Sequence, residues 1–460
     1  MLIWRTGQKR ILQNRRGEAF RAHKVKYSDF YNFDNKMEIN KTTVLKNQYI
    51  YAVITKFIIV AISFLNSVLI ARYLGADLKG MAATTINAAN IISTVITLGL
   101  NEAYPLFRKK KESASYLSEY MTVVIAIFGA YLLITTGVLF FLHSRIEIVC
   151  CAYISILMGY ATIVNYIALV EEPNHRNKVM VWMYVIDVAI LAFLYIFVPA
   201  NYYIAIFVSS FIYIAQAVYY SIDLKYTVNL QLISAEHIIT YVKFGCIPML
   251  MALLTTVNYR VDVVMLRMNP SISYTEIGIY SIGVSLAEKV FLVPNAVKEV
   301  LLSKLAKGKN EDEVCKVIRI CWPICMFTTI GIAVLGRPFI NLFYGSDYSD
   351  SYSVTVVCLL GTVFMLFFKM ILTYTIVNGK QKASMCMLCC SDAVNVFLNA
   401  VLIPEYGIMG AAFASDVSYF ICAWIFVTYF SRSNNIKFRD ILIIKKSDIE
   451  AMVVGFNAKG

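Results

Sequence analysis

Long apolar stretches of about 20 residues recur along most of this chain, and they constrain its fold more than any other feature. A run of that length matches the hydrocarbon thickness of a bilayer when it is helical. Lipid offers no partners for backbone groups, so each run must form its own hydrogen bonds as a helix. We predict twelve membrane-spanning helices, near residues 49–71, 81–104, 118–142, 147–170, 179–199, 202–222, 238–262, 276–297, 317–343, 352–377, 384–403 and 408–430.

The composition supports an all-α polytopic membrane protein, because 59% of the residues are hydrophobic and only 15% are charged. The net charge of +13 does not indicate nucleic-acid binding, since the basic residues lie in short segments between the apolar runs. Those segments share one side of the predicted topology, whereas the turns at 199–201 and 404–407 carry no Lys or Arg. The positive-inside rule therefore predicts that both termini are cytoplasmic.

Several weak similarities at one offset indicate an internal duplication. Asp187 precedes Pro199 by the same distance as Asp392 precedes Pro404, about 200 residues later. A further alignment sets Asn66 on Asn258 and Gly80 on Gly278. Two six-helix halves in the same orientation follow, with a substrate site expected between them. We divide the chain into a basic segment 1–48, a first bundle 49–223, a linker 224–237, a second bundle 238–430 and an amphipathic tail 431–460. Met37 is a second possible start, which leaves open whether residues 1–36 belong to the native protein.

Polar and ionisable residues inside the apolar runs are candidates for function, because such groups are costly in lipid. The second span carries a polar stripe of Thr84, Asn87, Asn90, Thr94, Thr97 and Asn101, which predicts a wet interior, although interhelical hydrogen bonding would also explain it. We expect a cationic chamber suited to phosphate. For each cation the alternative is a structural ion pair or a side chain that extends to the membrane surface from the end of a span. The candidate cations are Lys56, Arg260, Lys289 and Lys369.

The intramembrane carboxylates are candidates either for structural pairs or for coupling to an ion. They are Asp187, Asp262, Glu288, Asp392 and Asp416. Arg72 and Glu102 lie near the outer ends of spans and are candidates for gating or anchoring.

Chemistry on a substrate is not expected. There is no GxxxxGK[ST] loop, and the four His are scattered. Cys386, Cys389 and Cys390 lie in an apolar run without a nearby His, which favours helix packing over a metal site. No cofactor is expected, and protons or sodium ions remain candidate coupling ions.

Four segments carry a family resemblance: LNSVLIARYLGADLKG from Leu65, the stretch from Val257 to Val297, GRPFINLFYGSDY from Gly336, and NVFLNAVLIPEYGIMGAAFAS from Asn395. They resemble the polysaccharide-transport branch of the multidrug/oligosaccharidyl-lipid/polysaccharide flippase superfamily over residues 41–430. The resemblance implies two six-helix bundles in a V around a central cavity.

The resemblance also implies transport of an undecaprenyl-pyrophosphate-linked oligosaccharide, a repeat unit of O-antigen, capsule or exopolysaccharide, across a bacterial cytoplasmic membrane. A polysaccharide polymerase and a chain-length regulator are the expected protein partners. We expect Lys56, Arg260 and Lys369 to engage the pyrophosphate, Asn87, Asn90 and Asn101 to contact sugar hydroxyls, and Asp187, Asp262 or Asp392 to couple transport to an ion gradient. A drug exporter of the same fold, a lipid II flippase and, as a different class, a membrane polymerase or ligase are the alternatives.

Overall fold

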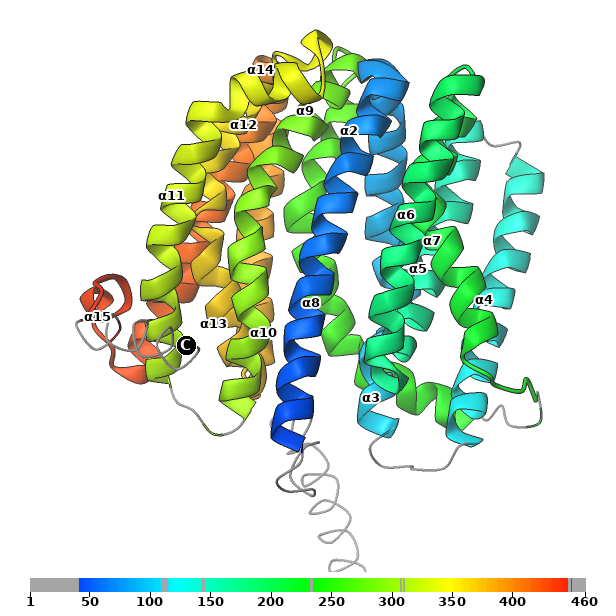
Figure 1. The fold of residues 1–460 in the computed structure, drawn as a ribbon, viewed down its shortest axis with the longest axis horizontal. Coiled ribbons are helices and arrows are strands. Elements are labelled where there is room, and N and C mark those ends of the chain that lie inside the picture. Colours follow the sequence, from blue (N-terminus) through cyan, green and yellow to red (C-terminus); the bar gives the residue numbers. More distant parts are fainter. Residues whose placement is uncertain are drawn as a thin grey trace, which may run out of the picture.

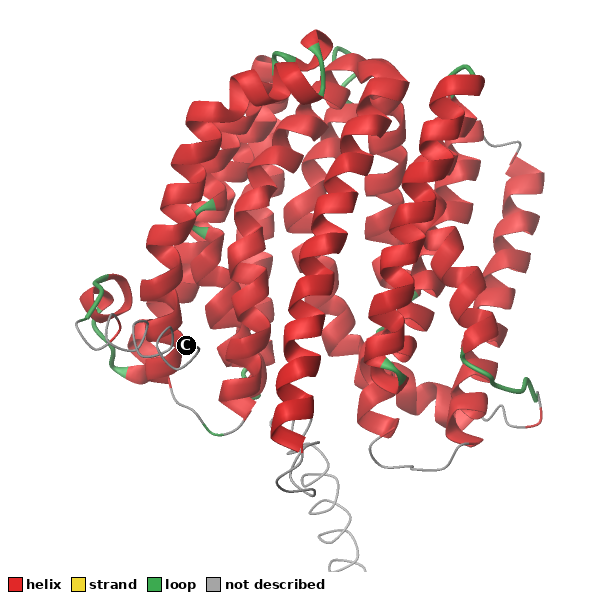
Figure 2. Ribbon diagram, in the orientation of Figure 1, coloured by secondary structure: helices red, strands yellow, loops and turns green. Residues whose placement is uncertain are grey.

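The computed structural model describes residues 41–108, 115–142, 145–229, 231, 235–306, 308, 311–445 and 448. These residues form helices and no strands (Figures 1 and 2). The first half comprises α2 (Lys41–Ile96), α3 (Leu100–Arg108), α4 (Ser115–Leu142), α5 (Ile146–Glu171), α6 (Pro173–Phe197) and α7 (Tyr202–Asp223). The second half comprises α8 (Ala235–Met268), α9 (Tyr274–Ala287), η3 (Glu288–Phe291), α10 (Leu292–Ala306), α11 (Glu311–Phe343), η4 (Ser346–Tyr348), α12 (Ser351–Thr362), α13 (Met365–Val377), α14 (Gln381–Asn434) and α15 (Phe438–Leu442).

The predicted twelve crossings are present. Nine described helices are long and apolar enough to span a membrane, and the bent pair α12 and α13 makes a tenth. Two of the nine, α2 and α14, double back at Gly75 and Gly407, where φ is 66° and 57° (Figure 1). Glycine adopts this left-handed conformation without a Cβ clash, so it permits a tight reversal. Each of these two helices therefore has two arms, and the described chain is long and apolar enough to cross a membrane twelve times.

Three predicted spans are less regular than their hydropathy indicated. The second span breaks at Leu98 and Gly99, where φ is 51° and 69°, and continues as α3. The eighth passes through the 3-10 turn η3, and the tenth bends by 42° between α12 and α13. Hydropathy reports how apolar a run is but not whether its backbone is continuous, so these breaks were not predicted.

We call the side where α2 begins and α14 ends the terminal face, and the side with Gly75 and Gly407 the opposite face (Figure 1). Each half has its own apolar core. A further core at the opposite face joins Val68 and Ala71 of α2 to Ile282 of α9 and Tyr348 of η4. The halves are thus joined at the opposite face. Toward the terminal face they meet again, because the first part of α8 packs on the first half, where the ring of Tyr241 lies 4.9 Å from the rings of Phe107 and Tyr120.

At the opposite face the halves approach closely through a reciprocal contact between two glycines. A Cβ on Gly80 would lie 1.7 Å from the carbonyl oxygen of Tyr274, and a Cβ on Gly278 would lie 2.0 Å from that of Ala76. Each glycine therefore meets the residue four positions before the other. A two-fold axis produces this reciprocity. The structure thus supports the alignment of Gly80 with Gly278 made from the sequence.

The tail folds back onto the second half at the terminal face. Arg319 of α11 forms an ion pair with Asp448 at 2.6 Å, and both side chains are almost fully buried. Arg319 also donates to the carbonyl oxygen of Asp440, and Ile441 is fully buried. The described part of the tail is therefore attached to the protein rather than free.

Replacing Asp448 with Asn should detach the tail at neutral pH. Hydrogen bonding from Arg319 lowers the pKa of Asp448 below its ordinary value. Because the folded-state pKa is lowered, the stabilisation is fully present above the ordinary carboxyl pKa of about 4 and is lost as the pH falls through the lower folded pKa. Breaking a buried ion pair costs about 3 kcal/mol, so amide hydrogen exchange in Phe438–Leu442 should accelerate about 100-fold.

The matched control is Asp440→Asn. The Asp440 side chain forms an exposed ion pair with Lys445 at 3.0 Å, and exposed pairs contribute little. Hydrogen exchange in Asp440→Asn should match the wild type, and wild-type exchange, corrected for its intrinsic pH dependence, should rise only below about pH 4. Equal protection in Asp448→Asn and wild type would show that the ion pair does not hold the tail.

Candidate functional site

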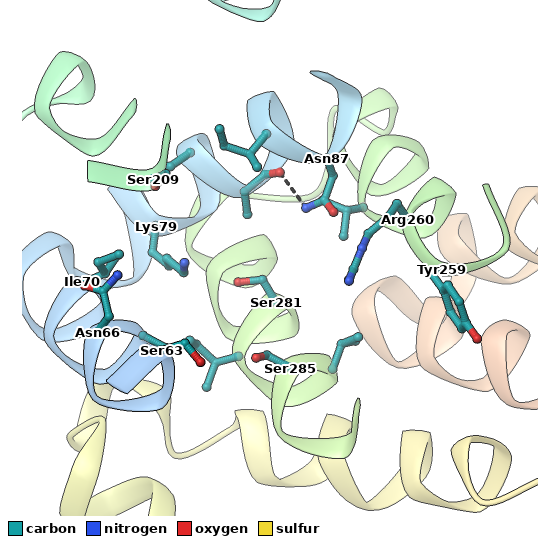
Figure 3. Close-up of a pocket in the computed structure, with 17 residues that line it drawn as sticks. Ser63, Asn66, Ile70, Lys79, Asn87, Ser209, Tyr259, Arg260, Ser281 and Ser285 are labelled. Atoms are coloured by element: carbon teal, nitrogen blue, oxygen red, sulfur yellow. Dashed lines mark hydrogen bonds between the residues drawn. The ribbon is translucent and has the colours of Figure 1, made fainter. Parts of the chain in front are cut away.

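A cavity of ≈ 280 Å³ lies between the two halves, in the part of the molecule toward the opposite face. Its walls come from both arms of α2 and from α7, α8 and α9 (Figure 3). The lining includes two cations, five serines and two amides among apolar side chains. The lining residues are Ser63, Asn66, Ser67, Ile70, Lys79, Ala82, Ala83, Ile86, Asn87, Ser209, Tyr259, Arg260, Val263, Ser281, Ile282, Val284 and Ser285.

Lys79 and Arg260 project into this cavity from opposite sides (Figure 3). Lys79 belongs to the descending arm of α2, and no hydrogen bond or ion pair joins it to any residue that the structure describes. An ammonium group in such a site needs an anion or water. Sequence reasoning missed Lys79, because the hydropathy boundaries placed it in an outer turn between spans.

Arg260 is paired with a carboxylate of its own half. Its two terminal nitrogens lie 3.2 and 3.3 Å from the two carboxylate oxygens of Glu288 in η3. The Arg260 side chain remains 32% exposed and that of Glu288 19% exposed, so the pair borders the cavity and is not sealed in the core. Arg260 therefore fits both interpretations: it is a cation of the cavity, and it forms a structural ion pair with Glu288.

Polar side chains of several spans, including one residue of the predicted stripe, reach the cavity. Ser63, Ser67, Ser281 and Ser285 line it, as does Asn87, whose amide nitrogen donates to the carbonyl of Ala83 at 2.7 Å. Asn90 and Asn101 are half-buried and are not among its lining residues. Thr84, Thr94 and Thr97 donate to carbonyls of their own helix at 2.8 to 2.9 Å. Hydroxyls satisfied in this way need no wet surroundings.

The other predicted cations differ in position. Lys369 donates to Asn295 at 3.2 Å and lies 4.3 Å from the ring centre of Phe291, beside the cavity but not among its lining residues. Lys289 is half-buried in η3. Lys56 lies in α2, but its side chain is outside the described residues.

Two buried carboxyl groups form equivalent pairs in the two halves. The side-chain amide of Asn66 donates to Asp187 at 2.6 Å, and that of Asn258 donates to Asp392 at 2.7 Å. The sequence alignment had matched both the asparagines and the aspartates, so the repeat extends to side-chain contacts. Only the first pair meets the cavity, through Asn66.

Asp262 and Asp416 lie inside the second half. Asp262 accepts hydrogen bonds from the Tyr280 hydroxyl and, at 2.7 Å, from the backbone nitrogen of Val263. Asp416 accepts from the backbone nitrogen of Gly361 at 2.7 Å. Both carboxyl groups are buried, and neither lines the cavity. Asn258 and Asp262, four residues apart in α8, share a helix face, and that face packs into the second half.

Arg72 and Glu102 lie at different faces, which corrects the placement of Glu102 near an outer end. Arg72 donates to the carbonyls of Phe343 and Leu342 at 2.6 Å, joining the halves at the opposite face. Glu102 lies in α3, toward the terminal face, and accepts from Tyr166 at 3.3 Å. The second span descends from the opposite face, so its last residues lie at the terminal face.

The arrangement can bind an anion together with hydroxyl-rich groups. Lysine and arginine recognise phosphate, while serine and asparagine exchange hydrogen bonds with hydroxyls. No group of three or more His, Cys, Asp or Glu suited to a metal ion occurs among the described residues.

Comparisons with known proteins find solved structures with the same fold. A lipid II flippase, MurJ, in an inward closed conformation superposes with a TM-score of 0.64 and 16% identity, covering 85% of this chain and 89% of that chain. An inward-facing multidrug resistance MATE family transporter of the MOP superfamily gives a TM-score of 0.62 and 12% identity, covering 84% and 98%. At these identities the likeness shows the fold alone.

Sequence comparison adds one partial match, and no family model matches the chain. The capsular polysaccharide biosynthesis protein CapF of Staphylococcus aureus is 26% identical over 152 residues. The match covers 31% of this chain and 37% of CapF, so the similarity spans little more than a third of that relative. The chain is a multi-pass membrane protein with the fold shared by lipid II flippases and MATE transporters.

Proposed function

We propose that this protein is a flippase that moves an undecaprenyl-pyrophosphate-linked oligosaccharide from the inner to the outer leaflet of a bacterial cytoplasmic membrane. The observation that carries the proposal is the cavity between the halves, where Lys79 has no ion-pair partner among the described residues and Arg260 is partly exposed, both among serines and asparagines. Drug cations would be repelled by this lining, whereas a pyrophosphate would be attracted.

The physical task explains why such a lining is needed. A pyrophosphate with a glycan crosses hydrocarbon only at a cost of several kcal/mol for each desolvated polar group. A cavity with cations and hydroxyls replaces the lost water while the polyprenyl chain stays in lipid. We assign the pyrophosphate to Lys79 and Arg260, and sugar hydroxyls to Asn87 and the cavity serines. The partial likeness to a capsule biosynthesis protein supports a polysaccharide precursor.

We assign the terminal face to the cytoplasm. Described basic residues at that face include Arg108, Arg176, Lys380 and Arg432, and basic loops remain on the cytoplasmic side. The contacts of Arg72, Gly80 and Gly278 at the opposite face then close the cavity toward the outside. Substrate would enter from the cytoplasmic leaflet.

Ion coupling remains a proposal centred on the two asparagine–aspartate pairs. Buried carboxyl groups in membrane helices commonly serve proton relays or cation sites. One oxygen of Asp392 and the amide oxygen of Asn258 are buried without a hydrogen-bond partner in the described structure. We assign coupling by protons or sodium ions to Asp392 and to its counterpart Asp187, with a polymerase and a chain-length regulator as partners downstream.

The proposal is tested by neutralising Lys79. Lys79→Gln should lower surface polysaccharide at least about tenfold at unchanged protein level, because one charge–phosphate contact contributes about 1.5 to 3 kcal/mol. The matched control is Lys382→Gln, an exposed lysine at the terminal face. Wild-type polymer levels with Lys79→Gln would remove the assignment of the cavity to phosphate.

A lipid II flippase is the second candidate, because a solved structure of one superposes over 85% of this chain. Both substrates carry a pyrophosphate and a sugar, so the cavity chemistry fits either. Depleting the protein from cells distinguishes the two functions. Loss of surface polysaccharide in viable cells supports the proposed function, whereas lysis with blocked peptidoglycan synthesis supports lipid II export.

A further inference from the structure

A second pocket lies outside the central cavity, between the two arms of α14 near the terminal face. It has a volume of ≈ 420 Å³, within the range of small-molecule sites. Met387 comes from the first arm, and Trp424, Thr428, Tyr429 and Arg432 come from the second. Nothing in the proposed transport path uses these residues.

The pocket has an apolar inner part and a cationic rim. Arg432 is exposed, and no ion pair joins it to the described part of the chain. Lys380 lies 5.8 Å from the ring centre of Tyr429, so a second cation borders the same opening. Two cations at the end of the apolar groove nearest the terminal face are suited to the anionic headgroup of a lipid whose acyl chain enters the groove.

An unpartnered hydroxyl lies in the same pocket. Thr428 Oγ1 is buried and has no hydrogen-bond partner within the described structure. Thr328 and Thr373, in other helices, donate to the carbonyl four residues earlier at 2.9 and 2.8 Å, whereas Thr428 shares its unpartnered state, among the described threonines, with Thr329 of α11. A buried hydroxyl without a partner costs free energy, and a bound polar group would supply the partner.

Aromatic residues place this pocket at the membrane boundary. Trp424 is 57% exposed, and its ring stacks on Phe438 of the attached tail at 5.6 Å. Tryptophan and tyrosine favour the level of lipid headgroups. The tail therefore lies beside the pocket and fixes the Trp424 ring at its edge.

We propose that this pocket binds one anionic phospholipid of the leaflet at the terminal face. The phosphate contacts Arg432 and Lys380, and an acyl chain lies along Met387 and Trp424. The site is separate from substrate transport, so it can be present whether or not the flippase assignment holds.

Native mass spectrometry of the full chain in detergent tests the site, using phosphatidylglycerol and phosphatidylcholine with identical acyl chains. Wild type should retain one phosphatidylglycerol in preference to phosphatidylcholine. Arg432→Gln should weaken phosphatidylglycerol binding about fivefold and leave phosphatidylcholine binding unchanged. Thr428→Val should weaken retention of both lipids, since it removes the hydroxyl and keeps the shape.

The matched control is Arg439→Gln, which removes an exposed cation of α15 that does not line the pocket. It should bind lipid like the wild type. Equal retention of both lipids by the wild type, or an equal loss in Arg439→Gln and Arg432→Gln, would overturn the proposal. A wild-type dimer that dissociates in Arg432→Gln would assign the pocket to a second copy of the chain and would also overturn it.

Discussion

Replacing Gly80 or Gly278 with valine will destabilise the protein by about 3 kcal/mol and abolish transport. Each substitution puts a side chain where the backbone of the other half already lies, 1.7 Å from the Tyr274 oxygen or 2.0 Å from the Ala76 oxygen. Backbone cannot rotate away as a flexible side chain can, so the two halves must separate at the opposite face. Thermal unfolding in detergent and surface polysaccharide in cells measure the two effects.

The matched control is Gly129→Val in α4, where an added Cβ would meet nothing within 4 Å. This variant should unfold at the wild-type temperature and retain transport. Because the contact is reciprocal, Gly80→Val and Gly278→Val should have similar effects. Wild-type stability in either variant would show that the halves do not approach each other as closely as described.

The second large effect concerns Arg260, whose two roles can be separated. Arg260→Gln leaves Glu288 without its partner and should cost about 2 kcal/mol, less than for a fully buried pair because both side chains are partly exposed. Transport should fall at least about tenfold. The double variant Arg260→Gln with Glu288→Gln should recover stability, since no unpaired charge remains, but should not recover transport.

Unfolding temperature and surface polysaccharide again provide the two measurements. Recovery of both in the double variant would mean that Arg260 is needed only to neutralise Glu288. Glu288→Gln alone leaves the cation free, so it should retain more transport than Arg260→Gln. An equal loss in the two single variants would contradict the assignment of Arg260 to substrate phosphate.

The repeat was the most informative feature of the sequence. Matching Asn66 with Asn258 and Asp187 with Asp392 rested only on weak similarities at one spacing, yet each half forms the same amide–carboxylate pair. Spacing is informative here because a duplicated bundle keeps its side-chain partners when its helices keep their order. The twelve crossings followed from run length for a similarly simple reason, since lipid permits few alternatives to a helix.

The cavity was less predictable, because it depends on where helices break and turn. Lys79 was overlooked since Gly75 reverses α2 within so few residues that Lys79 already belongs to the descending arm. The polar stripe of the second span suggested more cavity contacts than exist, because its threonines bond to their own backbone. Periodicity identifies a polar helix face, but it does not show whether the side chains of that face already have hydrogen-bond partners.

The attachment of the tail has a practical consequence for measuring motion. Arg319 and Ile441 hold Phe438–Leu442 against α11 and the apolar core of the second half, and Phe438 stacks on Trp424 of α14. The segment must therefore move with that half as one rigid body. A fluorophore at Ile443, paired with one on α4, would report the angle between the halves during turnover without any probe inside the transport path.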